Sequence, residues 1–140
     1  MINLVFGIDD DATASFIAAV TIKKAEFSKS FRSFNFPTEV IKYLEEQNKL
    51  DISKKTIPDL IFLDLQMPMM DGWEFLDMFN KEFASYFPQT RFIILSSSVD
   101  PDDASKAKKT ASVLGFYQKP LKVELLNSLK NTEYLRRFFE

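Results

Sequence analysis

The chain has 140 residues, of which 46% are hydrophobic and 27% are charged, so it is long enough for one globular domain and too apolar for a disordered chain. Its 18 basic and 20 acidic residues give a formal net charge of −2, which leaves no basic excess for a nucleic acid backbone. The absence of cysteine and histidine excludes disulfides, thiolate and imidazole catalysis, and the usual zinc sites. We therefore expect a single domain over residues 1–140 whose chemistry uses carboxylates, hydroxyls and lysines.

Strand-like segments recur along the chain. Residues 2–8 form a short apolar run that is followed by acids instead of a signal cleavage site, which favours a cytoplasmic protein. Near residues 28–33, phenylalanines are interleaved with polar residues, and we expect a short edge strand there. Three further runs are continuous and rich in β-branched or aromatic residues, as parallel strands covered on both faces are: residues 60–63, 92–95 and 113–117.

Helical periodicity fills the segments between these strands. Apolar residues recur on one stripe over 40–44 and again over 74–83. Thr38, which follows a proline, is a candidate cap for the first of these helices. Residues 48–58 lack any periodicity and are expected to form a mobile surface loop.

Two more helices are predicted in the second half of the chain. Asp100 followed by Pro101 is typical of an N-cap and a first helical position, so a helix should begin near residue 101. The spacing of apolar residues over 122–138 predicts an amphipathic helix at the C-terminus.

The alternation of strands and helices predicts an α/β fold, with helices on both faces of one doubly wound parallel sheet. Ligands of such folds bind outside the carboxyl ends of the strands. Since neighbouring strand ends lie only about 5 Å apart, side chains at these ends are expected to meet in one site. The residues at the ends of four predicted strands are all polar: Asp9 and Asp10, Asp64, Ser96 and Lys119.

Three carboxylates in one site repel each other and lower stability unless cations compensate them. A divalent metal ion and Lys119 would together balance their charge, and ligands that are all oxygen favour Mg²⁺ or Mn²⁺. Carboxylates, a hard cation, a hydroxyl and a lysine together indicate phosphoryl transfer, in which an aspartate attacks phosphorus. We expect Asp64 to be this nucleophile, because it ends the central apolar strand, and Asp9 and Asp10 to hold the metal.

Four segments at these strand ends together resemble the receiver domain of two-component response regulators: Asp9-Asp10, Phe62 to Gly72, Leu95 to Ser98, and Phe116 to Pro120. The resemblance spans nearly the whole chain and implies a flavodoxin-like (βα)5 fold with strand order 2-1-3-4-5. It also implies Mg²⁺-dependent transfer of a phosphoryl group from a histidine kinase or histidine phosphotransfer protein. The expected output is contact with a downstream protein at the face formed by residues 101–138, without enzymatic activity on another substrate.

The resemblance assigns the metal and phosphorylation roles by position. Asp64 would be phosphorylated. Asp10, Asp64 and the backbone carbonyl of Gln66 would bind the metal, and Asp9 would act mainly through water.

The resemblance also implies a switch. Ser96 matches the switch Ser/Thr, Lys119 the lysine that pairs with the phosphoryl group, and Phe116 the switch aromatic residue. The Lys119–Pro120 bond would be cis. Serine at 96 in place of the commoner threonine, and phenylalanine at 116 in place of tyrosine, could change the size of the switching movement.

Simpler interpretations remain for some of these residues. Asp11 is expected only to cap the first helix, and Asp71 followed by glycine is most simply a turn and helix start. Two other functions also stay open. The chain could be a degenerate receiver that acts only as a docking module, or a phosphatase of the haloacid dehalogenase type. The phosphatase needs an acid two residues after its nucleophile, where this chain has Gln66.

Overall fold

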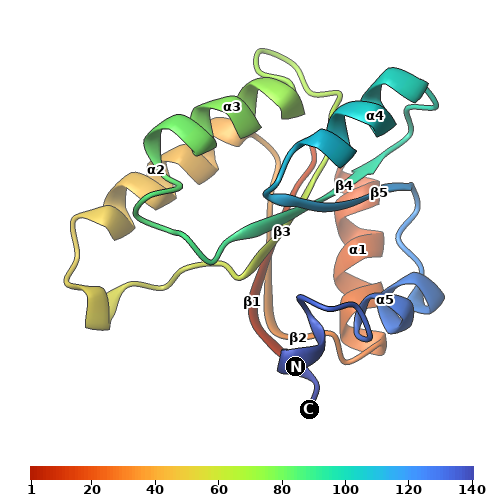
Figure 1. Ribbon diagram of the computed structural model, residues 1–140, viewed down its shortest axis with the longest axis horizontal. Coiled ribbons are helices and arrows are strands. Elements are labelled where there is room, and N and C mark those ends of the chain that lie inside the picture. Colours follow the sequence, from red (N-terminus) through yellow and green to blue (C-terminus); the bar gives the residue numbers. More distant parts are fainter.

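The computed structural model describes residues 1–140 as a five-stranded parallel sheet with helices on both faces (Figure 1). The strands are β1 (Ile2–Ile8), β2 (Ser28–Phe34), β3 (Leu60–Leu63), β4 (Arg91–Ser96) and β5 (Val113–Gln118). They pair in the order β2-β1-β3-β4-β5, and every neighbouring pair is parallel. The predicted α/β class, strand order and edge strand are therefore confirmed.

Two helices cover one face of the sheet and three cover the other. The helices are α1 (Ala12–Lys24), α2 (Pro37–Asn48), α3 (Gly72–Glu82), α4 (Pro101–Lys109) and α5 (Val123–Leu129), with short 3₁₀ helices at Ile52–Lys54 and Arg136–Phe138. The face with α1 and α5 is opposite the face with α2, α3 and α4 (Figure 1). No helix combines the length and apolar character that a membrane span requires.

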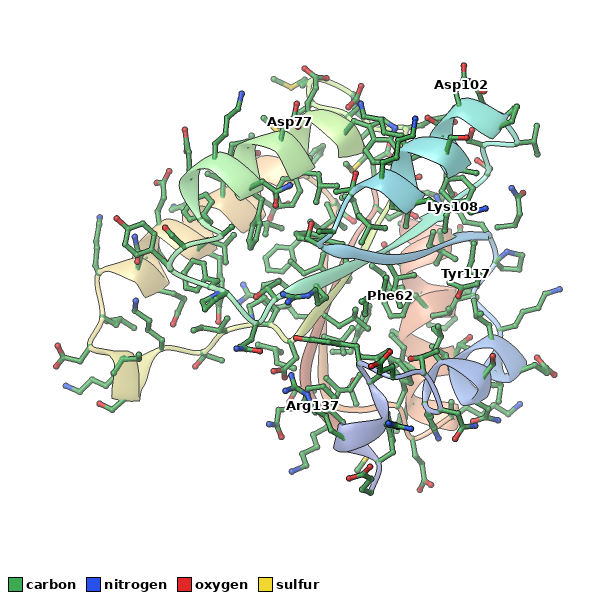
Figure 2. All side chains as sticks on the ribbon, viewed as in Figure 1. Phe62, Asp77, Asp102, Lys108, Tyr117 and Arg137 are labelled. Atoms are coloured by element: carbon green, nitrogen blue, oxygen red, sulfur yellow. The ribbon has the colours of Figure 1, made fainter.

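The central strand β3 is buried on both of its faces. Leu60 and Phe62 pack with residues of α1 and α5, whereas Ile61 and Leu63 pack with residues of α2 and α3. Phe62 accordingly lies inside the protein, while Asp77 projects from the outer surface of α3 (Figure 2). Burial on both sides explains why this segment reads as a continuous apolar run instead of an alternating one.

The N-terminus of α3 is fixed next to the end of β3. The carboxylate of Asp71 accepts a hydrogen bond from the N–H of Glu74 at 2.8 Å, and the Glu74 carboxylate accepts one from the N–H of Asp71 at 3.1 Å. This reciprocal capping box satisfies two N–H groups at the start of the helix. Further along, Phe79 packs edge-on against Phe92 of β4, with ring centroids 5.0 Å apart. The helix is therefore anchored to the sheet along its length.

The C-terminal helix is shorter than the sequence predicts. It ends at Leu129, not at residue 138. The hydroxyl of Thr132 donates a hydrogen bond to the carbonyl oxygen of Leu129 at 2.6 Å, and such local bonds compete with continuation of a helix. The apolar spacing beyond this point still serves the core, because the following turns bring Leu135 into a buried position.

Of the two N-caps predicted for α2 and α4, the structure contains one. Asp100 caps α4 as predicted, since its carboxylate accepts a hydrogen bond from the N–H of Asp102 at 2.9 Å. Thr38 does not cap α2. Phe36 occupies the N-cap position and Pro37 the first helical position, where proline is already favourable. The segment 48–58 connects α2 to β3 as a mostly exposed loop, interrupted by the first 3₁₀ helix.

Candidate functional site

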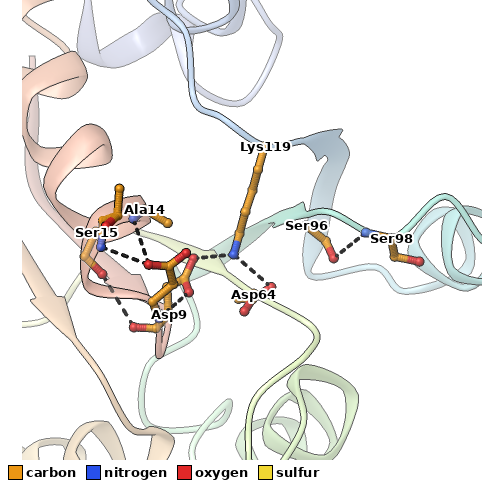
Figure 3. Close-up of polar contacts among 9 residues, drawn as sticks. Asp9, Ala14, Ser15, Asp64, Ser96, Ser98 and Lys119 are labelled. Carbon is orange, nitrogen blue, oxygen red and sulfur yellow. Dashed lines mark hydrogen bonds and ion pairs between the residues drawn. The ribbon is translucent and has the colours of Figure 1, made fainter.

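The candidate site lies at the carboxyl edge of the sheet, where four strands end in polar residues. Asp9 directly follows β1, Asp64 follows β3, Ser96 closes β4, and Lys119 follows β5. Because these strands are parallel neighbours, their carboxyl ends meet at one edge. The side chains of Asp9, Asp64 and Lys119 converge there (Figure 3).

Lys119 joins two acids that come from different strands. Its ammonium nitrogen lies 2.6 Å from Oδ2 of Asp9 and 3.4 Å from Oδ1 of Asp64. The side chain of Lys119 is 18% exposed, and those of Asp9 and Asp64 are 13% and 4% exposed. Solvent therefore screens these ion pairs less than it would a pair on the surface. The peptide bond between Lys119 and Pro120 is cis.

Three carboxylates gather at this position. Asp9, Asp10 and Asp64 each offer an oxygen atom, and these atoms all lie within 4.8 Å of one another. With Lys119, these residues form what we call the acidic pocket, whose three acids and one lysine leave a formal charge of −2. An uncompensated charge of this size is unfavourable where burial limits solvation. A cluster of carboxylate oxygens with one exposed member, Asp10, fits a hard cation that retains some of its water, such as Mg²⁺ or Mn²⁺.

The electrostatics of the acidic pocket perturb the pKa of Asp64. Burial raises this pKa from its ordinary value of 3.8 to about 6, with a further contribution from the negative charge of Asp9. Lys119 and the backbone N–H of Gln66 act in the opposite direction. For Lys119, burial lowers the pKa, but its hydrogen bond to Asp9 and the charges of both acids outweigh burial, so that its pKa is raised. At neutral pH Asp64 is thus ionised, but at a larger free-energy cost than a surface carboxylate.

Asp11 serves the helix and lies outside the acidic pocket, as predicted. Its carboxylate accepts a hydrogen bond from the N–H of Thr13 at 2.9 Å and so caps α1. The N–H of Asp11 in turn donates to Oδ1 of Asp9 at 2.9 Å. The start of α1 therefore also orients one carboxylate of the site.

Ser96 and Phe116 are not among the residues that pair in the acidic pocket. Ser96 is fully buried, and its hydroxyl accepts a hydrogen bond from the N–H of Ser98 at 3.1 Å (Figure 3). Phe116 is partly buried and packs against a small apolar cluster, which consists of Leu65, Ile94 and Ala107. The Ser96 hydroxyl points toward Ser98 and away from Asp64 (Figure 3), so the side chain would have to turn to reach a group on Asp64.

Gly72 supports the site in a way that the sequence did not reveal. A Cβ atom at this position would lie 2.5 Å from the carbonyl oxygen of Asp64 and 2.9 Å from Cα of Leu65. Only glycine therefore allows the start of α3 to approach the backbone of Asp64 this closely. The sequence signal was a glycine directly after a capping aspartate, which the geometry of a turn also explains.

A polar network around Asp103 was also missed. Its carboxylate accepts hydrogen bonds from the indole of Trp73 and from the hydroxyl of Ser98. Trp73 and Asp103 are 30 positions apart in the chain, so no local spacing pattern could indicate that they meet.

Known proteins are similar to this chain in sequence and fold. Residues 5–130 match the family model for the response regulator receiver domain. The chain is similar to a two-component response regulator from Cytophaga hutchinsonii, with 30% identity, a TM-score of 0.84, and coverage of 96% of this chain and 98% of that one. It is similar to a response regulator receiver protein from Dyadobacter fermentans, with 26% identity, a TM-score of 0.74 and coverage of 97% of each chain.

A more distant structure shares the fold alone. The chemotaxis protein CheY4 from Vibrio cholerae is 22% identical, with a TM-score of 0.69 and coverage of 93% of this chain and 98% of that one. No curated protein sequence matches this chain. The family match spans most of the sequence and includes every residue of the acidic pocket. The chain therefore belongs to the response regulator receiver domain family.

Proposed function

We propose that this receiver domain accepts a phosphoryl group on Asp64, from the phosphohistidine of a histidine kinase or histidine phosphotransfer protein. The observation that supports this most directly is the ammonium group of Lys119 between two carboxylates, 2.6 Å from Asp9 and 3.4 Å from Asp64. A nucleophile, a fixed positive charge and a cluster of metal-binding oxygens in one pocket are the parts that phosphoryl transfer requires.

The proposed reaction is a substitution at phosphorus. An oxygen of the ionised Asp64 carboxylate attacks, and a P–O bond forms as the P–N bond to the donor histidine breaks. The histidine nitrogen keeps the electron pair of that bond, and an acyl phosphate remains on Asp64. Lys119 then moves from the carboxylate of Asp64 to the oxygens of the phosphoryl group, where its charge is still balanced by Asp9.

Asp9, Asp10, Asp64 and the backbone carbonyl of Gln66 would hold the metal ion. When bound, Mg²⁺ supplies positive charge that neutralises the phosphoryl oxygens. The chain itself contributes the arrangement of the acids, and Asp9 keeps Lys119 in place by its ion pair. The Ser96 hydroxyl would donate a hydrogen bond to a phosphoryl oxygen after it turns away from Ser98, and Phe116 would follow into the space that this frees.

The output of the domain is proposed to be contact with a downstream protein, at the face formed by residues 101–138. A groove on this face lies between α4 and β5 and is lined mainly by apolar side chains, together with Lys108. The segment that forms this face also carries five lysines: Lys106, Lys108, Lys109, Lys122 and Lys130. Four of them are available to a partner, since Lys130 donates a hydrogen bond to the carbonyl oxygen of Ala25. A partner with an acidic patch matches this charge. Replacement of these lysines by glutamate with no loss of partner affinity would reject this part of the proposal.

Mass spectrometry after incubation with acetyl phosphate and Mg²⁺ tests the phosphorylation. We expect one added phosphoryl group in the wild-type protein and none in Asp64→Asn. Asp77→Asn is the matched control, because Asp77 is an exposed acid on α3 outside the acidic pocket, and it should be labelled as the wild type is. Labelling that persists in Asp64→Asn contradicts the assignment. No labelling of the wild type favours the docking module, and sustained release of phosphate from simple phosphate esters favours the phosphatase.

A further inference from the structure

The loop between β4 and α4 is tied down by a set of polar contacts that the proposed chemistry does not use. The carboxylate of Asp103, in the first turn of α4, accepts a hydrogen bond from the Ser98 hydroxyl at 2.7 Å and another from Nε1 of Trp73 at 3.0 Å. The ammonium group of Lys106 lies over the Trp73 ring, 4.7 Å from its centroid. One carboxylate thus connects the loop, α3 and α4.

Ser98 is the residue on which these contacts converge. Its carbonyl oxygen accepts a hydrogen bond from the side chain of Gln118 at 2.6 Å, and its hydroxyl accepts one from the N–H of Asp100 at 3.2 Å. Its own N–H donates to the buried hydroxyl of Ser96 at 3.1 Å. The position of Ser98 therefore determines the direction in which the Ser96 hydroxyl is held by this hydrogen bond (Figure 3).

The remaining attachment of α4 to the protein is weak. Ala107 is the only buried residue of the helix. Its apolar cluster has just three buried members, Ala107 included, compared with 14 in each of the two large clusters. A segment that buries little apolar surface opens at low free energy. The polar contacts of Asp103 are therefore a large part of what fixes α4 and the loop before it.

We propose that Asp103 is a positioning residue that holds Ser96, through Ser98, in the arrangement in which its hydroxyl faces the loop and not Asp64. The proposal rests on the proposed function, since it concerns how readily Ser96 can reach a phosphoryl group on Asp64. When the Ser96 side chain turns, its hydrogen bond with the N–H of Ser98 breaks and the loop that contains Ser98 has to move. The contacts of Ser98 with Asp103, Asp100 and Gln118 oppose this movement. The lowered pKa of Asp103, caused by its bonds to Ser98 and Trp73, agrees with a carboxylate engaged at both oxygens.

This restraint has a measurable consequence. A protein whose binding-competent arrangement is only a minor fraction binds its ligand more weakly by that fraction. Weakening the bonds of Asp103 should raise the fraction, and we expect about a fivefold increase in the apparent affinity for a phosphoryl group mimic, the effect of removing about one net hydrogen bond. A residue that only stabilised the fold would not raise this affinity when replaced.

The test uses beryllofluoride with Mg²⁺, which occupies the place of a phosphoryl group on a carboxylate, and calorimetry of the whole chain. Asp103→Asn and Ser98→Ala should each increase the affinity, and the double variant should gain no more than the stronger single variant, since both break the same contact. Asp102→Asn is the matched control: it removes the same charge from the first turn of α4, and its affinity should equal that of the wild type. Amide hydrogen exchange without beryllofluoride should be faster over 97–109 in Asp103→Asn and unchanged in Asp102→Asn.

The outcomes separate this inference from the proposed function. If wild-type protein binds beryllofluoride and Asp103→Asn binds it equally well or more weakly, the inference is overturned while the proposed function stands. Additive gains in the double variant also overturn it. If neither wild type nor Asp64→Asn binds beryllofluoride, the proposed function fails. Hydrogen exchange over 97–109 then still tests the restraint by Asp103, and unchanged exchange in Asp103→Asn would overturn it.

Discussion

The raised pKa of Asp64 predicts that the metal-free protein becomes more stable as the solution is acidified from pH 7 to pH 5. The folded carboxyl group has a pKa of about 6, against an ordinary value of 3.8. The folded state therefore binds a proton in this range that the unfolded state does not. The stability that this proton contributes is fully present below pH 3.8 and is lost as the pH rises through about 6.

The size of the effect follows from the two pKa values. The whole difference is worth about 3 kcal/mol, and the part that falls between pH 7 and pH 5 is about 1 kcal/mol. For a chain of 140 residues, this corresponds to a rise in melting temperature of about 3 °C. The chain has no histidine or cysteine, the side chains that ordinarily titrate near neutral pH. Burial also raises the pKa of Asp59, so the contribution of Asp64 is the difference between the wild type and Asp64→Asn.

Urea denaturation in EDTA at pH 5, 6 and 7 measures the effect. We expect the free energy of unfolding to increase toward pH 5 in the wild type and in Asp77→Asn, and to increase clearly less in Asp64→Asn, where only Asp59 keeps a raised pKa. Excess Mg²⁺ should reverse the trend, because the ion competes with the proton for the ionised carboxylate and stabilises the folded state more at pH 7. A wild-type stability in EDTA that is flat or falls toward pH 5, or the same slope in Asp64→Asn, would contradict a raised pKa of Asp64.

Three further substitutions test other parts of the structure. Lys119→Met should destabilise the metal-free protein by about 1 to 3 kcal/mol, because two partly buried carboxylates lose their partner. Urea titrations should show that Mg²⁺ restores part of this stability, and an unchanged stability would contradict the ion pairs of Lys119. Gly72→Ala should lower the free energy of unfolding by about 2 to 3 kcal/mol, since the new Cβ meets the backbone of Asp64. It should also slow labelling by acetyl phosphate, and normal labelling would mean that α3 can move aside. Met69→Gly should stabilise the protein by about 0.5 to 1 kcal/mol. Met69 is 96% exposed and has a φ of 72°, a backbone conformation that strains any residue except glycine. A lower melting temperature in this variant would show that the Met69 side chain stabilises the protein by more than its backbone strain costs.

The sequence predicts which strand-end side chains meet, because their meeting follows from strand topology. Asp9, Asp64 and Lys119 each follow an apolar run, and the carboxyl ends of parallel strands have to meet at one edge. Their convergence could therefore be predicted without any knowledge of side-chain contacts. Which acid Lys119 contacts more closely could not be predicted, since that depends on rotamers and on the hydrogen bond that orients Asp9 from the start of α1.

Features that depend on distant contacts or on competition at helix ends were not predictable. The apolar spacing of the C-terminal segment continues past Leu129. The helix ends there, where the Thr132 hydroxyl donates a hydrogen bond to the Leu129 carbonyl oxygen. The meeting of Trp73, Ser98 and Asp103 requires α3 and α4 to lie side by side on the same face of the sheet. Neither event leaves a periodic pattern in the sequence.

The proposed function requires that the carboxylates at the ends of β1 and β3 and the lysine after β5 act together as one phosphoacceptor site. A crystal structure of the protein grown with Mg²⁺ and beryllofluoride tests it most directly. We predict the beryllofluoride on the carboxylate of Asp64, with Lys119 against its fluorine atoms and a metal ion bound by Asp10 and Asp64. A beryllofluoride group on another residue, or a metal ion bound away from these acids, would contradict the proposed function.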